Sequence, residues 1–358
     1  MAKKSRRRSG NPAARGQAAR NPTRPSSSEG SSPGGAGRDS VSSRLVRGAE
    51  NAGQLPEGVP PDGAPYPQIL RGTSYEWWRS MLGVVFGLSL YLLMTAVVTQ
   101  VVVGISWGIA GAPGAFEDFS RRAMAFEVPA GMLAANLGIA TLIPICWVLM
   151  AIVHQVRPRW LSSVQPRMRW KYLLISAAVA LVVLNGVTLL PLIFGGPQVT
   201  VSPQPGLWGF LIVIVLTSPL QAAAEEYFFR GYLMQALGSL VAHPAFGVVV
   251  SALLFALMHG VQNPALFVNR LGFGLLAGIL VWRTGGLEAG IGAHVVNNIC
   301  AYLIAGLTSS MAAVRGVSSI SWVDSGIQLG GYALFAVIAM LIARRLKLRT
   351  TVNLALGR

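Results

Sequence analysis

Charged side chains are scarce in this sequence. Asp, Glu, Lys and Arg together make up 12% of its 358 residues and only 13 positions are acidic, whereas hydrophobic residues make up 53%. Soluble domains carry about 25% charged residues, which cover their surface. The composition therefore excludes an ordinary soluble enzyme and indicates that most of the chain lies in lipid.

Cysteine is also scarce, and no cleavable signal peptide is recognisable. The two cysteines, Cys146 and Cys300, both fall inside apolar stretches. This argues against a disulfide framework and a cysteine metal site, so we expect both side chains simply to pack. The first residues, MAKKSRRRSG, are basic, but no apolar stretch with a cleavage site follows them. We therefore expect the first apolar span to serve as an uncleaved membrane anchor.

Aromatic and β-branched residues are almost absent from the first 75 positions, where Ser, Gly, Pro, Ala and Arg dominate. Such a stretch cannot form a core, so we predict that residues 1–75 form a disordered, basic cytoplasmic tail. Its cluster from Lys3 to Arg8 is compatible with binding to nucleic acid or anionic lipid. A solvated tail that sets membrane topology explains the cluster as well. We therefore expect no specific nucleic-acid partner.

Long apolar runs fill the remainder of the chain and predict an all-α, polytopic transmembrane helical bundle over residues 76–350. A helix needs about 20 apolar residues to cross about 30 Å of hydrocarbon. Residues 231–242 are predicted to form a short connecting helix. By the length criterion we expect about eight spans, near 81–104, 129–154, 171–195, 206–229, 246–262, 266–283, 288–308 and 327–344.

The basic residues outside the tail gather in two segments, and the loop at 196–205 is uncharged. Positively charged loops remain on the cytoplasmic side of a membrane. We therefore expect a multi-pass protein of the cell membrane with its N- and C-termini in the cytoplasm and the lipid bilayer as its partner. The two segments contribute Arg157, Arg159, Arg167, Arg169, Lys171, Arg344, Arg345, Lys347 and Arg349.

Two adjacent acidic residues, Glu225 and Glu226, lie in the apolar segment TSPLQAAAEEYFFRGYL. A carboxylate at the centre of a membrane helix costs about 2.5 to 3.5 kcal/mol, so such groups are usually paired and functional. Glu226 and Arg230 are i,i+4 neighbours and can neutralise each other, whereas Glu225 points about 100° away. Glu225 then has no cation nearby in the sequence and is a candidate general base.

Two of the four histidines, His259 and His294, lie within apolar helical segments rather than loops. His259 ends the sequence Phe255-Ala-Leu-Met-His259. His294 and Asn298 are one helical turn apart, so both can point at one target and donate hydrogen bonds to it. Each group alone is compatible with a packing role, but three such sets in successive helical segments favour a shared site.

At these positions the sequence resembles the CAAX protease and bacteriocin-processing family of intramembrane proteases, which includes the Ras-converting prenyl endopeptidase. The motifs are Glu-Glu-x-x-x-Arg at 225–230, Phe-x-x-x-His at 255–259 and His-x-x-x-Asn at 294–298. The resemblance covers about residues 170–310, which would form the protease-like core.

The resemblance implies catalytic roles for the matching residues. Glu225 would activate a water, and His259 would help to hold or deprotonate that water. Glu226 and Arg230 would support the orientation of the site.

The same resemblance leaves two versions of the mechanism open. In the metal-free version, which we favour without a cofactor, His294 and Asn298 would donate hydrogen bonds to the oxyanion. In the other, zinc would be bound by Glu225, His259 and His294. Against zinc, the sequence has no His-Glu-x-x-His, and the amide of Asn298 suits an oxyanion better than a metal.

The resemblance implies an endopeptidase that hydrolyses a peptide bond of a membrane-embedded or lipid-proximal peptide, with its cavity open towards the cytoplasm. The substrate is left open. The Arg-, Gly- and Ala-rich tail is typical of a prokaryotic protein and disfavours a CAAX substrate. Two alternatives are a non-catalytic membrane scaffold or immunity protein, and a transporter in which Glu225 and the histidines relay protons.

Overall fold

The computed structural model of the chain describes residues 58–193 and 200–356. Residues 1–57, which hold most of the predicted tail, lie outside the described part. Within the described part every element is a helix, and extended pairing is limited to two isolated bridges. The prediction of an all-α fold is confirmed.

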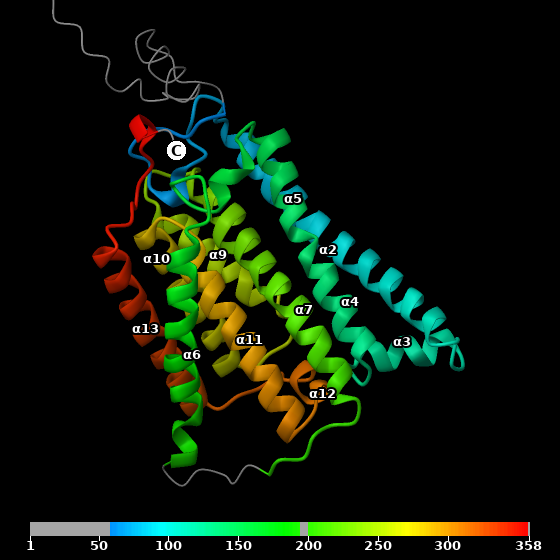
Figure 1. The fold of residues 1–358 in the computed structure, drawn as a ribbon. Coiled ribbons are helices and arrows are strands. Elements are labelled where there is room, and N and C mark those ends of the chain that lie inside the picture. Colours follow the sequence, from blue (N-terminus) through cyan, green and yellow to red (C-terminus); the bar gives the residue numbers. More distant parts are fainter. Residues whose placement is uncertain (1–57, 194–199, 357–358) are drawn as a thin grey trace, which may run out of the picture. The chain divides into compact units, whose positions relative to one another are not determined.

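Among the described residues, seven helical segments are long and apolar enough to cross a membrane, so the chain is a multi-pass membrane protein (Figure 1). Two of them are compound: α4, α5 and a π-helical turn η2 (Leu149–Val153) form one, and α7, a π-helical segment η4 and α8 form the other. The seven segments are α2 (Trp77–Ile109), α4 to η2 (Pro129–Ala140, Leu142–Val148 and the turn), α6 (Trp170–Ile193), α7 to α8 (Leu207–Glu225, Glu226–Leu233 and Met234–Gly238), α10 (Pro264–Thr284), α11 (Glu288–Thr308) and α13 (Trp322–Arg345).

Short helices precede, connect and follow these segments. They are η1 (Tyr66–Gln68), α3 (Phe116–Met124), η3 (Pro158–Leu161), α9 (Ala245–Leu257), α12 (Met311–Arg315) and η5 (Leu354–Leu356).

The fifth predicted span, 246–262, is shorter than expected. Its helix α9 has 13 residues, which correspond to about 20 Å and are fewer than a helix needs to cross a hydrocarbon layer of about 30 Å alone. The helix ends because Gly260 adopts a φ of 77°, a left-handed conformation that favours glycine. Asn263 then caps α10 by accepting a hydrogen bond from the Leu266 amide. The α9 and α10 helices therefore form a hairpin whose turn holds residues 258–263.

The fourth segment is longer than expected. Instead of ending near residue 229 and giving way to a separate helix at 231–242, the helix continues to Gly238. Its turns widen to a π-helix from Glu226 to Leu233. Single π-helical turns are frequent at functional sites because they shift side chains relative to a regular helix. Here the widening begins at the second of the two adjacent glutamates.

Residues 58–75 belong to the stretch that we expected to be disordered, but they are packed in the structure. The side chains of Tyr66, Ile69 and Leu70 are almost completely buried. The amide of Gly63 donates a hydrogen bond to the Val352 carbonyl, and the amide of Val352 donates one to the Ala64 carbonyl. These few apolar residues at helical spacing are sufficient for packing, and they hold the start and the end of the described chain together.

The helices that carry the motifs are neighbours. Helix α11 packs against α6 and α7, and α10 packs against α9 and α13 (Figure 1). The π-helical segment η4 also contacts α9 and α10. This arrangement brings the motif residues of α7, α9 and α11 to one region of the bundle.

Candidate active site

Glu226 and Arg230 form a completely buried ion pair. The Nη1 atom of Arg230 donates a hydrogen bond of 3.0 Å to Oε1 of Glu226. The side chains are 0% and 1% exposed, respectively. The i,i+4 pairing expected from the sequence is therefore present, and solvent cannot reach the Glu226 carboxylate.

Two aromatic rings enclose the Arg230 guanidinium. Its central carbon lies 4.0 Å from the centre of the Phe255 ring and 4.9 Å from that of Phe273. The Nε and Nη2 atoms of Arg230 are buried and find no hydrogen-bond acceptor in the described part of the chain. The ring faces supply the compensating electrostatic attraction. Phe255 belongs to the predicted motif, whereas Phe273 was not identified from the sequence.

His294 connects the two glutamates. Its Nδ1 atom lies 2.9 Å from Oε1 of Glu226, and its Nε2 atom lies 3.6 Å from Oε2 of Glu225. The ionised Glu226 carboxylate beside Arg230 can only accept hydrogen bonds. The Nδ1 atom of His294 therefore carries the ring hydrogen and donates a hydrogen bond to Glu226. In neutral His294, Nε2 is then a bare nitrogen that faces Glu225. Glu225 has no cation close to it in the sequence, and its neighbour in the structure, His294, comes from another helix, α11.

Glu225 is linked to Asn298 through a residue that sequence analysis missed, Gln221. The Nε2 atom of Gln221 donates a hydrogen bond of 2.7 Å to Oε1 of Glu225. The Nδ2 atom of Asn298 donates one of 3.1 Å to Oε1 of Gln221. Gln221 is 5% exposed and lies one turn before Glu225 on the same helix. Its signal in the sequence was a lone amide in an apolar segment at i,i+4 spacing from Glu225.

His259 lies at the open edge of the site, in the turn after α9. Its Nδ1 atom is 2.7 Å from the Phe255 carbonyl, to which it donates, so Nε2 is left free. The residue is exposed, unlike Glu226 and Arg230. Its ring lies near enough to the Glu225 carboxylate for the charge of that group to act on it, but its hydrogen bond goes to its own helix. The site is thus buried at Glu226 and exposed at His259.

The residues named for a zinc site were Glu225, His259 and His294. In the part of the chain that the structure describes, no group of three or more His, Cys, Asp and Glu side chains is placed to hold a metal ion. We therefore derive no step of the reaction from a metal.

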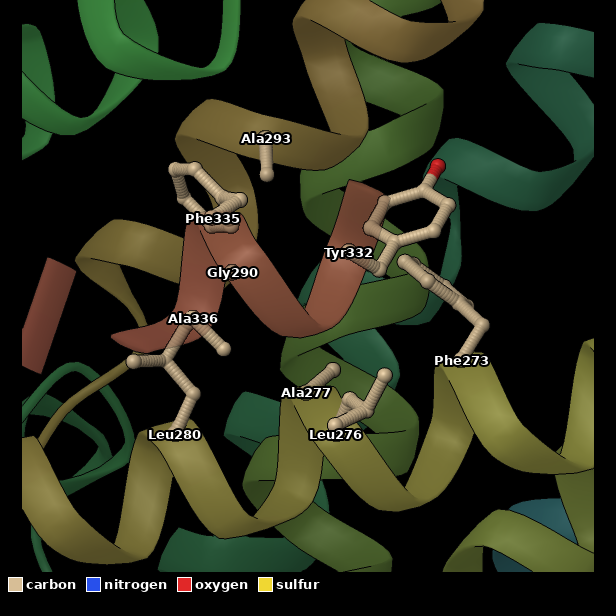
Figure 2. Close-up of a pocket in the computed structure, with 9 residues that line it drawn as sticks. All are labelled: Phe273, Leu276, Ala277, Leu280, Gly290, Ala293, Tyr332, Phe335 and Ala336. Carbon is tan, nitrogen blue, oxygen red and sulfur yellow. The ribbon is translucent and has the colours of Figure 1, made fainter. Parts of the chain in front are cut away.

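An apolar crevice lies behind the buried ion pair, between α10, α11 and α13 (Figure 2). Its residues surround about 260 Å³ of space that no atom fills, part of which is open to the outside. Figure 2 shows Phe273 and Tyr332 side by side at one end of it and Leu280 with Ala336 at the other. Gly290 separates this crevice from the site, because a Cβ atom on Gly290 would lie 2.9 Å from Oε2 of Glu226.

Comparison with known proteins agrees with the motifs. Residues 206–300 match the family described as type II CAAX prenyl endopeptidase Rce1-like. This segment contains all three motifs, so the resemblance stated from them is confirmed there. A Bacillus subtilis (strain 168) protein named "Uncharacterized protein YyaK" is 32% identical over 126 residues. The match covers 34% of this chain and 41% of the relative. No solved structure matches the chain.

Proposed function

We propose that the chain is an intramembrane endopeptidase that hydrolyses a peptide bond of a membrane-embedded or lipid-proximal peptide. The observation that carries this proposal is the convergence of Glu225, His294 and Asn298, from two neighbouring apolar helices, on one partly open site. A base and amide donors within a helical bundle are what peptide hydrolysis in a membrane requires. The family match over residues 206–300 supports the same reaction class.

Glu225 is the base in the proposed reaction. Its side chain is 11% exposed, whereas that of Glu226 is 0% exposed, so Glu225 alone of the pair can meet a water. Oε1 of Glu225 is engaged by Gln221, and Oε2 faces Nε2 of His294. A water bound to Oε2 gives its proton to Glu225, and its oxygen forms a bond to the carbonyl carbon of the peptide. Glu225 then passes the proton to the amine nitrogen as the C–N bond breaks.

Asn298 and His294 have different roles in this scheme. The Nδ2 group of Asn298 has two hydrogens, and Gln221 accepts one of them, so the other can be donated to the oxyanion. His294 donates its Nδ1 hydrogen to Glu226. Its Nε2 atom can donate to an oxyanion only after it has taken up a proton. His294 therefore orients the water or carries a proton, and Asn298 is the principal oxyanion donor.

His259 stands at the entrance of the site. Its free Nε2 atom can hold the attacking water as it approaches Glu225, because its Nδ1 atom is fixed by the Phe255 carbonyl. Glu226 and Arg230 do not contact the substrate in this scheme. Glu226 holds the His294 ring by accepting the hydrogen bond from Nδ1, and Arg230 holds Glu226.

The proposed topology places both ends of the described chain in the cytoplasm. The segment around Ala64 and the segment around Val352 are hydrogen-bonded to each other, so they lie on the same side of the membrane. The basic loop before α6 lies at the same end, because Ser163 pairs with Gly286 and the amide of Val164 donates to the Gly285 carbonyl. Positively charged loops favour the cytoplasmic side.

The test is cleavage of a quenched-fluorescence peptide library, with lipidated and unlipidated members, by the detergent-purified chain. Wild type is compared with Glu225→Gln and with Glu127→Gln, an exposed carboxylate at 52% side-chain exposure, each with and without a zinc chelator. We expect cleavage by wild type and by Glu127→Gln, and none by Glu225→Gln, irrespective of chelation. Loss of wild-type cleavage on chelation would establish the zinc version. Equal activity of folded wild type and Glu225→Gln would overturn the protease assignment.

A further inference from the structure

Gln221 lies between Glu225, the proposed base, and Asn298, the proposed oxyanion donor. It is outside the three motifs. It bridges Glu225 and Asn298 with hydrogen bonds of 2.7 Å and 3.1 Å. It is 5% exposed and comes from α7, whereas Asn298 comes from α11. We propose that Gln221 is a positioning residue that sets the orientation of the Asn298 amide. This inference rests on the proposed function.

The partners of the two amides allow one orientation only. The Glu225 carboxylate accepts hydrogen bonds, so the NH2 group of Gln221 must face it and its oxygen must face Asn298. An oxygen at that place requires the NH2 group of Asn298. On the other side, Nδ2 of Asn297 donates a bond of 3.4 Å to Oδ1 of Asn298, which agrees with the same orientation. Asn298 thus donates to Gln221, and Gln221 donates to Glu225, so the hydrogen bonds all run in one direction.

This direction matters because the two ends of an asparagine amide have opposite effects on an oxyanion. An NH2 group donates to the developing negative charge and stabilises it, whereas a carbonyl oxygen repels it. Without the Gln221 oxygen, the one remaining described bond that favours this orientation of the Asn298 amide is the long contact of 3.4 Å from Asn297. The effect falls on the transition state and not on substrate binding, so kcat decreases while KM changes little.

A second buried glutamine in the same helical segment provides a matched control. Gln235 is 0% exposed, and its Nε2 atom donates to the Trp160 carbonyl at 3.2 Å, away from the site. Replacing either glutamine by methionine removes one buried amide of similar size. A loss that is merely structural would therefore be shared by both variants.

The experiment is a double-mutant cycle on peptide cleavage. The variants are Gln221→Met, Asn298→Ala, their combination, Gln235→Met and Gln235→Met with Asn298→Ala. Removing one hydrogen bond that acts in the transition state corresponds to a decrease of about tenfold in kcat. We expect this decrease for Gln221→Met with KM almost unchanged, and no further decrease when it is added to Asn298→Ala. Gln235→Met should leave kcat nearly unchanged in either background.

The outcomes separate this inference from the proposed function. If wild type cleaves and Gln221→Met lowers kcat equally with and without Asn298, the positioning role is wrong and the proposed function stands. Full activity of Gln221→Met would have the same meaning. If wild type cleaves no member of the library while monodisperse and cooperatively folded, both are overturned. Thermal unfolding of each variant identifies any that lose activity through misfolding, and for these Gln221→Leu, which also lacks the acceptor oxygen, replaces the methionine variant, with the same loss of kcat expected.

Discussion

The Nδ1 atom of His294 lies 2.9 Å from Oε1 of Glu226, whose other neighbour is the Arg230 guanidinium at 3.0 Å. This contact places Glu226 behind the imidazole and leaves Glu225 in front of it. Two adjacent glutamates of one helical segment therefore have different surroundings. Glu226 is buried against the Arg230 guanidinium, whereas Glu225 is partly exposed.

Replacing Glu226 by Gln should reduce both stability and activity. The variant leaves the buried Arg230 charge without its carboxylate, and breaking one partner of a buried pair costs about 3–5 kcal/mol. It also removes the acceptor of the His294 Nδ1 hydrogen. Thermal unfolding in detergent measures the first effect, and peptide cleavage at a temperature where the variant is folded measures the second. A Glu225→Gln variant that lost as much stability as Glu226→Gln would contradict the different surroundings.

A methyl group on Gly290 should displace the Glu226 carboxylate. The Cβ atom of Gly290→Ala would lie 2.9 Å from Oε2 of Glu226, too close for a normal contact. We expect a decrease in kcat of about tenfold or more, because Glu226 no longer holds His294. Gly330→Ala, on α13, is the control, because a Cβ atom there meets nothing within 4 Å. Equal activity of the two variants would show that Gly290 has no part in positioning Glu226.

Shortening Phe273 should weaken the aromatic enclosure of Arg230. Phe273→Leu removes one of the two rings over the guanidinium, a cation–π contact of about 1–2 kcal/mol. Phe335→Leu removes a similar ring from the same crevice, and Phe335 has no cation over its ring among the described contacts. Both variants should lose stability in thermal unfolding, but only Phe273→Leu should also lower kcat. Comparable kcat values for Phe273→Leu and Phe335→Leu would exclude a role of the Phe273 ring in the site.

The chain should lose stability in mild acid because of His154, which directly follows the membrane-spanning segment Pro129–Val153. Burial, and secondly the charge of Arg79, lower the pKa of His154 from 6.5 to about 4. The unfolded state therefore binds more protons between these values, so stability falls as the pH decreases from 6.5 to 4. The neutral ring is hydrogen-bonded to the Tyr232 hydroxyl at 3.1 Å.

The measurement is the melting temperature in detergent between pH 7 and 4, for wild type and His154→Gln. We expect the decrease with falling pH to be smaller in the variant. Parallel curves for the two proteins would show that His154 does not contribute to the acid sensitivity.

The features that the sequence predicted are those that depend on one segment at a time. Apolar runs of sufficient length predict spans, and the i,i+4 pairing of Glu226 with Arg230 follows from helix geometry. The contact of His294 with both glutamates depends on how α11 packs against α7 and on the wider turns that begin at Glu226. Helix geometry alone therefore could not show which side chains surround Glu225.

Other features were missed for the same reason. The ring of Phe273 reaches Arg230 from α10, and Gly290 is needed only because the Glu226 carboxylate lies against it. Neither residue carries a charge or a polar group that would single it out in the sequence. The packing of residues 58–75 was missed because Tyr66 and its two apolar neighbours are few in a segment rich in Pro and Gly.

The most direct test of the central claim, that Glu225 activates a water to hydrolyse a peptide bond, is cleavage in ¹⁸O-labelled water followed by mass spectrometry of the products. The account predicts one heavy oxygen in the new carboxyl terminus formed by wild type, and no product from a folded Glu225→Gln variant. Labelled product formed at the same rate by both proteins, or no product from a folded wild type with any peptide of the library, would contradict it.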